Sequence, residues 1–334
     1  MKILIIRLSS IGDVLLTTPV VRCLKRQLDD VEIHFLTRDS NRQLLSSNPY
    51  IDKLPRLDKK ISKTIARLRS EHYDYVIDLH NIRTTARIRL ALSSPKLVYK
   101  KENIHKFLTV ITKRDFMSGR HVVDRYMDAV RPLGVTPDSQ GLDLYLPEEL
   151  KDSNLYKVDL DGVNVGELTS QPYVVIVCGA QHLTKCMPAD KIHLLASYLS
   201  CRVVLLGDGD DRKRLRNFAI PFKSNVVNLC GKTSLLMSAA IISHASVVIT
   251  PDTGMMHFAA AFHRKIIAVW GATTPSFGFS AYNSEHADCV VDNLWCNPCS
   301  RMGTGRCPLG HFKCMKNQSW QQIAESAQRI CMEK

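Results

Sequence analysis

The sequence predicts an α/β protein with two tandem parallel sheets, and three observations carry this prediction. Short runs of β-branched and aliphatic residues recur along the chain, each followed by a loop and a stretch with helical spacing of apolar residues. Such alternation is typical of parallel βαβ units. The series of predicted strands stops once and then restarts after a polar segment. The length of 334 residues also exceeds what a single core usually holds, which favours two domains.

The first sheet is predicted from three buried strands in the N-terminal half of the chain. The three runs are residues 2–8 (KILIIRL), 31–36 (VEIHFL) and 75–79 (YVIDL). After the first run, Gly12 opens a segment whose apolar spacing suits a helix over residues 14–28. The first strand therefore leads through a short turn into a helix, as in a βαβ unit.

The second sheet is predicted from four strands in the C-terminal half. They are residues 173–178 (YVVIVC), 202–206 (RVVLL), 245–250 (ASVVIT) and 265–270 (KIIAVW). The polar and acidic segment 147–172 lies between the two sets and is the predicted linker. We therefore expect an N-terminal domain over residues 1–160, a C-terminal domain over 161–318, and a terminal helix, 319–334, that packs back on the first domain. Two such halves predict a cleft between them that faces the carboxyl ends of both sheets.

Composition and charge indicate a folded protein with an anionic partner. Hydrophobic residues make up 45% and charged residues 23% of the chain, which excludes a disordered or fibrous protein. Lys and Arg number 45 against 32 Asp and Glu, so that the net charge is +13. Nucleic acid, an anionic membrane face and a phosphorylated small molecule all fit this excess, and charge alone does not choose between them.

The first residues do not resemble an export signal. The apolar run at residues 3–6 ends at Arg7, whereas a secretory signal needs about 7–15 apolar residues. No run approaches the roughly 18 apolar residues of a membrane-spanning helix. We therefore expect a cytoplasmic protein whose 11 cysteines are reduced thiols or metal ligands rather than disulfides.

The turn after the first predicted strand carries a candidate catalytic carboxylate. In an open α/β sheet this turn, residues 9–13 (SSIGD), lies at the ligand crevice. Gly12 permits a tight turn and the close approach of a ligand. Asp13 is placed either to act as a general base or to cap the following helix, and capping does not exclude catalysis. The turn lacks the GxGxxG pattern of dinucleotide-binding folds, which weakens a nicotinamide interpretation.

A loop with small residues, a hydroxyl and a lysine follows the first strand of the second sheet. Thr184 and Lys185 stand in this loop, residues 179–185 (GAQHLTK), before a helix predicted near Pro188. Both side chains suit a diphosphate, with Lys185 as a point charge and the helix N-terminus as a hydrogen-bond donor. A lysine that is merely solvated is the alternative. The loop is not a Walker motif, because the GxxxxGK[ST] spacing is missing.

An acidic loop, residues 207–211 (GDGDD), follows the next predicted strand. An acidic residue at this place often binds ribose hydroxyls. The loop also contains the DxD pattern at Asp208 and Asp210, and paired carboxylates suit Mg²⁺. A flexible acidic turn is the alternative to a metal site.

The most informative segment is residues 249–261 (ITPDTGMMHFAAA), where a predicted strand gives way to a helix rich in small residues. Asp252 or Thr253 can cap this helix, and Gly254 lets the backbone approach a ligand closely. The first N–H groups of such a helix suit a diphosphate. His257 falls in the first turn, where it can donate to a phosphate oxygen or protonate a leaving group.

A group of cysteines near the C-terminus predicts either a structural zinc site or a set of reduced thiols. One CxxC pair is followed by two further cysteines, and four thiolates at such spacing can hold zinc. Because only one CxxC pair is present, unliganded thiols remain the alternative. The four candidate zinc ligands are Cys296, Cys299, Cys307 and Cys314.

Two long segments of the chain resemble glycosyltransferase family 9, the lipopolysaccharide heptosyltransferase family. They are residues 2–25 (KILIIRLSSIGDVLLTTPVVRCLK) and 250–275 (TPDTGMMHFAAAFHRKIIAVWGATTP). Shorter matching pieces begin at Tyr73, His121 and Asn228, so the resemblance covers nearly the whole chain. It implies a GT-B fold, with two tandem Rossmann-like domains and an interdomain cleft, in agreement with the two predicted sheets.

The resemblance also implies a reaction and a set of site residues. In this family heptose moves from ADP-heptose, with inversion, to Kdo or a previous heptose of the lipopolysaccharide inner core, and no metal or other cofactor is required. Asp13 is similar to the family's proposed base for the acceptor hydroxyl. The ribose acid maps to Asp211 or Asp210, because the acidic loop departs from the usual small-residue form. The remaining donor-binding residues implied are Gly12, Thr184, Lys185, Asp252, Thr253, Gly254 and His257.

The basic excess of the first domain suits an anionic acceptor. Lipid A carries phosphates and its core sugar a carboxylate, so an electropositive domain fits the anionic inner leaflet. We expect an enzyme peripheral to the inner membrane, with an ADP-sugar as donor and the lipid A core as acceptor. Solvated basic faces are the alternative for most of these residues individually. The acceptor-binding candidates are Arg83, Arg87, Arg120, His121 and Arg125.

Three alternatives accompany this interpretation. The first is a family 9 enzyme that uses another nucleotide sugar or acceptor. The second is a basic nucleic-acid-binding protein with a structural zinc site, which the missing second CxxC pair and the 7% aromatic content disfavour. The third is an inactive family member, which the joint presence of Asp13, Lys185 and His257 disfavours.

Overall fold

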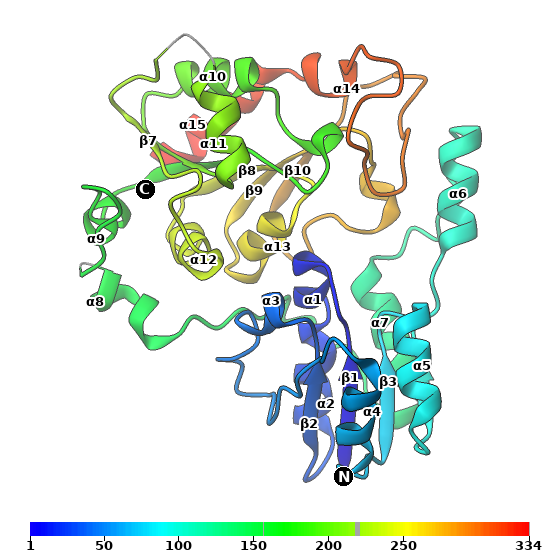
Figure 1. The fold of residues 1–334 in the computed structure, drawn as a ribbon. Helices are drawn as coiled ribbons and strands as arrows, with labels where there is room; N and C mark the ends of the chain where they lie inside the picture. Colours follow the sequence, from blue (N-terminus) through cyan, green and yellow to red (C-terminus); the bar gives the residue numbers. More distant parts are fainter. Residues whose placement is uncertain (156, 218–220, 334) are drawn as a thin grey trace. The chain divides into compact units, whose positions relative to one another are not determined.

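The computed structural model describes residues 1–155, 157–217 and 221–333, and it divides into two compact units (Figure 1). Each unit is built on its own parallel sheet, which confirms the predicted α/β fold class. Within these described residues, no helix combines the length and the apolar character needed to cross a bilayer.

The division into units differs in detail from the predicted domain boundaries. The first unit comprises Met1–Glu102 and Arg120–Tyr145. The second comprises Asn103–Gly119 and Leu146–Lys334. Residues 103–119, which the sequence places in the first domain, are therefore part of the second unit.

The sheet of the first unit has four parallel strands in the order β2-β1-β3-β4. Ile3 of β1 lies opposite Ile33 of β2 and Tyr75 of β3, and the inner strand is a continuous apolar run because both of its faces are covered. The sequence predicts three of these strands and misses β4, which has only three residues and is half-buried. The strands are β1 (Lys2–Ile6), β2 (Glu32–Leu36), β3 (Tyr75–Asp78) and β4 (Lys96–Val98).

The helix predicted over residues 14–28 is divided into two helices. Pro19 lies in the first turn of the second of these, where its missing N–H leaves no hydrogen bond unmade. One continuous helix would lack the bond from residue 19 to the Leu15 carbonyl, which instead accepts from the Thr18 hydroxyl at 2.7 Å. The helices of this unit are α1 (Ile11–Leu15), α2 (Thr18–Gln27), α3 (Asp39–Arg42), α4 (Ile61–Arg69), α5 (Arg83–Ala91), α7 (Val122–Val130) and the 3₁₀ turn η1 (Arg131–Leu133).

The sheet of the second unit has six parallel strands in the order β10-β9-β8-β5-β6-β7. The four predicted strands form its centre, and their residues are almost all buried. The two outermost strands are not predicted, because β7 is short and half-buried and β10 is largely polar and exposed. The strands are β5 (Tyr173–Val177), β6 (Arg202–Leu206), β7 (Val226–Asn228), β8 (Val247–Pro251), β9 (Lys265–Val269) and β10 (His286–Cys289).

The predicted linker contains short helices rather than an extended connection. Its helices α8 and α9 contact each other and belong to the second unit. The helices and 3₁₀ turns of this unit are α6 (Asn103–Thr112), η2 (Glu148–Leu150), α8 (Asp152–Leu155), α9 (Val165–Thr169), η3 (Leu183–Lys185), α10 (Ala189–Tyr198), α11 (Gly209–Arg216), α12 (Leu235–Ser243), α13 (Gly254–Ala261), η4 (Pro275–Phe277), α14 (Lys313–Lys316) and α15 (Trp320–Met332).

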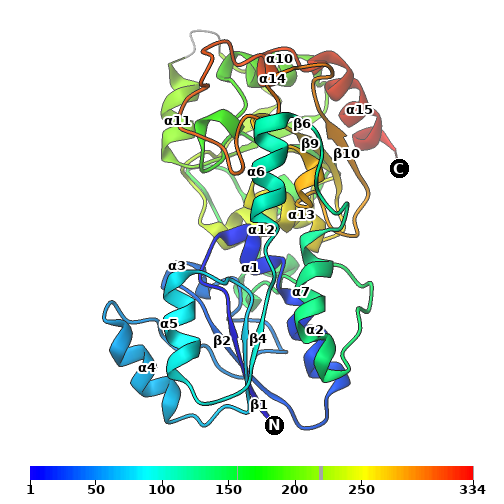
Figure 2. The ribbon, with the colours of Figure 1, turned by 90° about the vertical axis from the view of Figure 1, so that its right-hand side faces the viewer.

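The terminal helix α15 packs on the second unit, so the prediction that it packs on the first domain is wrong. It lies against α10 and contacts strands β5, β8 and β9 (Figures 1 and 2). Its apolar residues Trp320, Ile323 and Ala327 are buried in the same core cluster as Val174 and Leu195. The helical spacing of these residues puts them on the face of α15 that completes this core.

Strand order reverses once in each sheet, and these reversals locate the candidate sites. In the first sheet the chain proceeds outward from β1 to β2 and then returns to β3 on the other side. In the second sheet the corresponding reversal lies between β5 and β8. Ligands of open α/β sheets bind at the carboxyl ends of strands at such a reversal.

Candidate active site

The reversal in the first unit is organised around the buried side chain of Arg7, directly after β1. Its Nη1 donates to the Leu79 carbonyl at 2.7 Å, and its Nε donates to the Ser9 carbonyl at 2.8 Å. The guanidinium carbon lies 5.6 Å from the centre of the Tyr126 ring, a cation–π geometry. These contacts hold the guanidinium group in place and leave its Nη2 atom for a further anionic partner.

That partner is Asp13, whose carboxylate Oδ1 lies 2.6 Å from Arg7 Nη2. The other oxygen, Oδ2, accepts from the Ser10 backbone N–H at 3.1 Å and from the Ser10 hydroxyl at 2.7 Å. Asp13 therefore does help to begin α1, as the N3 residue of a capping box in which Ser10 is the N-cap. The carboxylate remains partly exposed, and Gly12 beside it is buried.

The charge state of Asp13 follows from the same contacts. Burial alone would raise the pKa of this carboxyl group, but the Arg7 guanidinium and the hydrogen bonds from Ser10 outweigh burial and hold its pKa below the ordinary value. Asp13 is therefore an ionised, fixed hydrogen-bond acceptor at neutral pH. Oδ2 already accepts two hydrogen bonds from Ser10, whereas Oδ1 pairs only with Arg7 and keeps a second lone pair that can receive a proton.

Two further side chains at the same sheet edge are not predicted from the sequence as site residues. The His80 ring, after β3, accepts from the Leu8 backbone N–H through Nδ1 at 3.2 Å. Burial and the positive charges of Arg7 and Lys101 lower the pKa of His80 to about 4, so its ring is neutral at pH 7. Burial and the Arg7 charge also lower the pKa of Lys101, after β4. The position of His80 just after the predicted strand over residues 75–79 is the signal by which it could have been found.

Four of the acceptor-binding candidates are found in three different settings. Arg83 and Arg87 lie on α5 with exposed side chains. His121 is the N-cap of α7, where Nδ1 accepts from the Val123 N–H at 3.2 Å. Arg125 is buried in an ion pair with Glu102 at 2.6 Å, so an acceptor would have to break that pair to reach its guanidinium.

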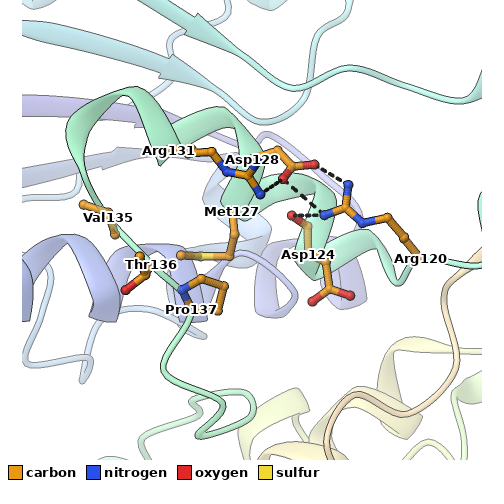
Figure 3. Close-up of a pocket in the computed structure, with 8 residues that line it drawn as sticks. All are labelled: Arg120, Asp124, Met127, Asp128, Arg131, Val135, Thr136 and Pro137. Carbon is orange, nitrogen blue, oxygen red and sulfur yellow. Dashed lines mark hydrogen bonds and ion pairs between the residues drawn. The ribbon is translucent and has the colours of Figure 1, made fainter.

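Arg120 lines a pocket of about 290 Å³ on the first unit, but much of its charge is already matched there (Figure 3). Its Nη1 lies 2.6 Å from the Asp128 carboxylate, which also pairs with Arg131 at 3.0 Å. One carboxylate thus joins two arginines at the pocket wall. The other lining residues are Asp124, Met127, Val135, Thr136 and Pro137, and none is a predicted site residue.

The reversal in the second unit brings together two residues predicted to bind the donor. Lys185 follows β5 and Asp252 follows β8, and the Lys185 ammonium lies 2.7 Å from Asp252 Oδ2. Both side chains are mostly buried. The same carboxylate oxygen accepts from the Thr273 hydroxyl at 2.8 Å, which fixes Asp252 from the side of β9.

The loop that carries Lys185 is held by a distant segment of the chain. The Thr184 hydroxyl donates to the Thr304 carbonyl at 2.9 Å and accepts from the Thr304 N–H at 2.7 Å. The prediction that Thr184 contacts a phosphate is therefore at odds with a buried hydroxyl that already has both partners. Gly303 has a φ of +96°, and a Cβ there would lie 2.9 Å from Cδ of Lys185. This glycine lets the loop pack directly on the lysine stem.

Helix α13 begins beside this ion pair and directs its first N–H groups toward the same sheet edge. Thr253 is the N-cap residue, and Gly254 is the first residue of the helix. His257, in the first turn, is buried. Four predicted donor residues, Asp252, Thr253, Gly254 and His257, therefore lie on one strand-to-helix junction next to Lys185. An N-terminus of this kind with a nearby ammonium group suits a phosphorylated ligand.

Asp211 is turned into its own loop rather than toward a ligand. Its carboxylate accepts from the Asp208 N–H at 3.0 Å and pairs with Arg214 at 2.6 Å. A Cβ at Gly207 would lie 2.6 Å from the same carboxylate, so the loop closes tightly around it. Burial raises the pKa of Asp211. The neighbouring Asp210 is exposed and therefore fits the ribose contact better.

The predicted zinc site is not assembled in this structure. Among residues 1–155, 157–217 and 221–333, no group of three or more His, Cys, Asp or Glu side chains is placed to hold a metal ion. Cys296 Sγ lies 3.8 Å from His311 Nε2. Burial, together with the nearby Cys299 and Cys307, raises the pKa of Cys314 to about 12.

Known proteins resemble this chain over most of its length. The family model described as glycosyltransferase family 9 (heptosyltransferase) matches residues 61–308. The lipopolysaccharide heptosyltransferase 3 of Escherichia coli is 30% identical over 291 residues, 80% of this chain and 82% of that protein. The lipopolysaccharide heptosyltransferase 1 of Campylobacter coli is 27% identical over 304 residues, 83% of this chain and 85% of that protein.

Solved structures show the same fold. The E. coli ADP-heptose lipopolysaccharide heptosyltransferase II superposes with a TM-score of 0.75 at 20% identity and covers 99% of both chains. At that identity the likeness concerns the fold, and it supports two Rossmann-like domains of the GT-B type.

Proposed function

Because this chain belongs to glycosyltransferase family 9, the heptosyltransferase family, we propose that it transfers heptose from ADP-heptose to the lipopolysaccharide inner core. The acceptor sugar is Kdo or a previous heptose, and the configuration at the anomeric carbon of the transferred heptose is inverted. The observation that carries this proposal is the pairing of Lys185 with Asp252 beside the N-terminus of α13, at the strand reversal of the second sheet.

The donor diphosphate is proposed to bind at this junction. A phosphate oxygen that approaches α13 meets its first N–H groups and the Lys185 ammonium, which is held in place by Asp252 at 2.7 Å. When the bond between the anomeric carbon and the phosphate oxygen breaks, the electron pair moves to the leaving ADP. Fixed positive groups at that place stabilise the developing charge without a reorganisation of solvent.

The acceptor hydroxyl is proposed to be activated by Asp13. The hydroxyl oxygen attacks the anomeric carbon from the face opposite ADP while its proton passes to an Asp13 carboxylate oxygen. Arg7 keeps this carboxylate ionised and oriented, because its own side chain is fixed by Leu79 and Ser9. A lowered pKa makes Asp13 a weak base, so its main contribution is the position of the proton acceptor.

No cofactor is proposed for this reaction, because Lys185 and the helix N-terminus supply the charge that a divalent cation would otherwise provide on a diphosphate. The acceptor lipid A core is anionic and membrane-bound. The protein is therefore proposed to act in the cytoplasm at the inner leaflet, to which its net charge of +13 attracts it. A different nucleotide sugar or acceptor within the family is the second candidate function.

Calorimetric titration with ADP, UDP and GDP in metal-free buffer tests the proposed donor. Selective binding of ADP without a metal ion is the expected result. A preference for UDP or GDP would keep the family and exclude ADP-heptose as the donor. A requirement for added Mg²⁺ would contradict the role given to Lys185.

A further inference from the structure

Helix α6 (Asn103–Thr112) presents its apolar face to solvent. Ile104 is 74%, Phe107 50% and Ile111 59% exposed. At 100° per residue these three side chains and Leu108 occupy one side of the helix, within an arc of about 100°. A helix on a globular domain ordinarily turns such a face toward the core, whereas α6 turns its apolar face toward solvent.

The opposite face of α6 is fixed to the second unit by polar and basic side chains. The Lys106 ammonium lies 4.0 Å from the centre of the Phe279 ring and 5.4 Å from that of Phe277. Thr109 is buried, and the Lys113 ammonium just after the helix donates to the Pro298 carbonyl at 2.8 Å. The outward direction of the apolar face is therefore set by specific contacts on the other side.

A second group of exposed apolar residues lies on the loop that Lys113 contacts. Trp295 is 72% and Met302 70% exposed, and Leu309 is also exposed. Figure 2 shows this loop, drawn in orange, beside α6, and the hydrogen bond from Lys113 to Pro298 joins the two segments. The second unit therefore carries large apolar side chains on two adjoining segments.

Basic residues outnumber acidic ones in the two segments that carry these apolar side chains. Segment 103–119 contains Lys106, Lys113 and Arg114 against one acidic residue, Asp115. Segment 295–316 contains four basic residues and no acidic one. Arg114, Arg301 and Arg306 are exposed. An apolar stripe with aromatic residues and flanking basic groups is the pattern of helices that lie in the interface of an anionic bilayer.

We propose that α6 and the loop over residues 295–309 form a docking surface for an anionic lipid bilayer. The apolar face of α6 enters the boundary between headgroups and acyl chains, and the basic residues contact lipid phosphates. A second copy of the chain fits less well, because a helix of ten residues is only about 15 Å long and a stable dimer buries about 800 Å² per partner. The inference rests on the proposed function for its choice of membrane, the leaflet that holds the acceptor.

Co-sedimentation with vesicles tests the surface directly. Full-length protein is mixed with phosphatidylglycerol/phosphatidylethanolamine vesicles and with neutral phosphatidylcholine vesicles. We expect binding to the anionic vesicles, and a loss of at least tenfold in the triple variant Ile104→Ser, Phe107→Ser, Ile111→Ser. The matched control is Leu90→Ser, which removes a 72% exposed leucine from α5 of the first unit and should bind as the parent does. Unchanged ADP affinity shows that the triple variant is folded.

A second variant and two acceptors keep the outcomes separate. Arg301→Gln with Arg306→Gln should weaken binding to anionic vesicles several-fold. The triple variant should transfer normally to a soluble, deacylated acceptor and poorly to one embedded in vesicles. A parent protein that glycosylates the soluble acceptor but does not bind vesicles overturns the docking inference and leaves the proposed function standing. Vesicle binding through α6 without any transfer would support the docking inference and contradict the proposed function. Vesicle binding unchanged in the triple variant, with loss of a dimer, would assign α6 to self-association and overturn the proposal.

Discussion

The Lys185 ammonium lies 2.7 Å from the Asp252 carboxylate, although the two residues follow different strands of the second sheet. Their strands, β5 and β8, are neighbours at the point where the strand order reverses. The carboxylate holds the ammonium group beside the N-terminus of α13. A diphosphate that binds there meets a positive charge already in position.

Replacing Lys185 should weaken donor binding. A hydrogen bond from a charged group contributes about 1.5–3 kcal/mol, so Lys185→Ala should lower ADP affinity about 10- to 100-fold by calorimetry. Lys185→Arg should recover part of this loss. Lys265→Ala is the matched control and should bind ADP normally, because this lysine pairs with Glu333 at the first residue of β9, away from the carboxyl ends of the strands. Equal affinity in Lys185→Ala and the control would remove Lys185 from the donor site.

Gly303 should be needed to place the Lys185 stem. Its φ of +96° and the 2.9 Å approach of a Cβ to Lys185 Cδ predict that Gly303→Ala strains the loop and displaces the lysine. We expect a loss of about 1–3 kcal/mol in the free energy of unfolding together with weaker ADP binding. Gly305→Ala is the matched control, because a Cβ at Gly305 would meet no described atom within 4 Å. If both variants bind ADP as the parent does, the glycine has no part in the donor site.

The Arg7–Asp13 ion pair should control the acid limb of the pH–rate profile. Arg7 holds the pKa of Asp13 below its ordinary value of 3.8, so the stability from this pair is present above that pH and is lost as the pH falls through the lower, folded pKa. Arg7→Met should raise the pKa of Asp13, move the acid limb to higher pH and lower kcat, while ADP affinity stays unchanged. Arg7→Lys should restore part of the profile. An acid limb that does not move in Arg7→Met would show that Asp13 is not the titrating base.

His80 should make the protein less stable in mild acid. The pKa of His80 is lowered from 6.5 to about 4 in the folded protein. Between these two pH values the unfolded chain binds a proton at His80 that the folded protein does not bind, so folding becomes less favourable as the pH falls. The loss of stability across this window should reach about 3 kcal/mol. His80→Asn, whose side-chain carbonyl can still accept from the Leu8 N–H, should flatten the dependence. Urea unfolding at pH 7 and pH 4.5 measures it, and equal slopes in both proteins would contradict the assignment.

The central strands and the donor junction can be predicted from the sequence because their signals are local. Continuous apolar runs mark the buried inner strands, and the turn from β8 into α13 contains Asp252, Gly254 and His257 within a few residues. Outer strands such as β10 carry polar residues, since only part of their surface is buried, and they leave no such run.

The rest of the candidate site depends on contacts between distant parts of the chain. The Thr184 hydroxyl is hydrogen-bonded to Thr304, 120 residues away, and no local sequence pattern predicts this contact. In the sequence Arg7 only marks the end of an apolar run, and its contacts with Leu79 and Asp13 form in the folded chain. The core on which α15 packs is likewise formed by strands remote in sequence. The helical spacing of α15 alone therefore does not indicate which unit this helix covers.

Transfer of heptose itself is the most direct test of the account. Purified protein is incubated with ADP-heptose and a deacylated inner-core acceptor in metal-free buffer, and the product is followed by mass spectrometry. We predict an increase in acceptor mass by one heptosyl unit, and no increase with Asp13→Ala, although that variant binds ADP nearly as well as the parent. Transfer by Asp13→Ala at the parental rate would contradict the role of Asp13 as the base. If the parent protein transferred no heptose to either a Kdo or a heptose acceptor, the proposed function would be wrong.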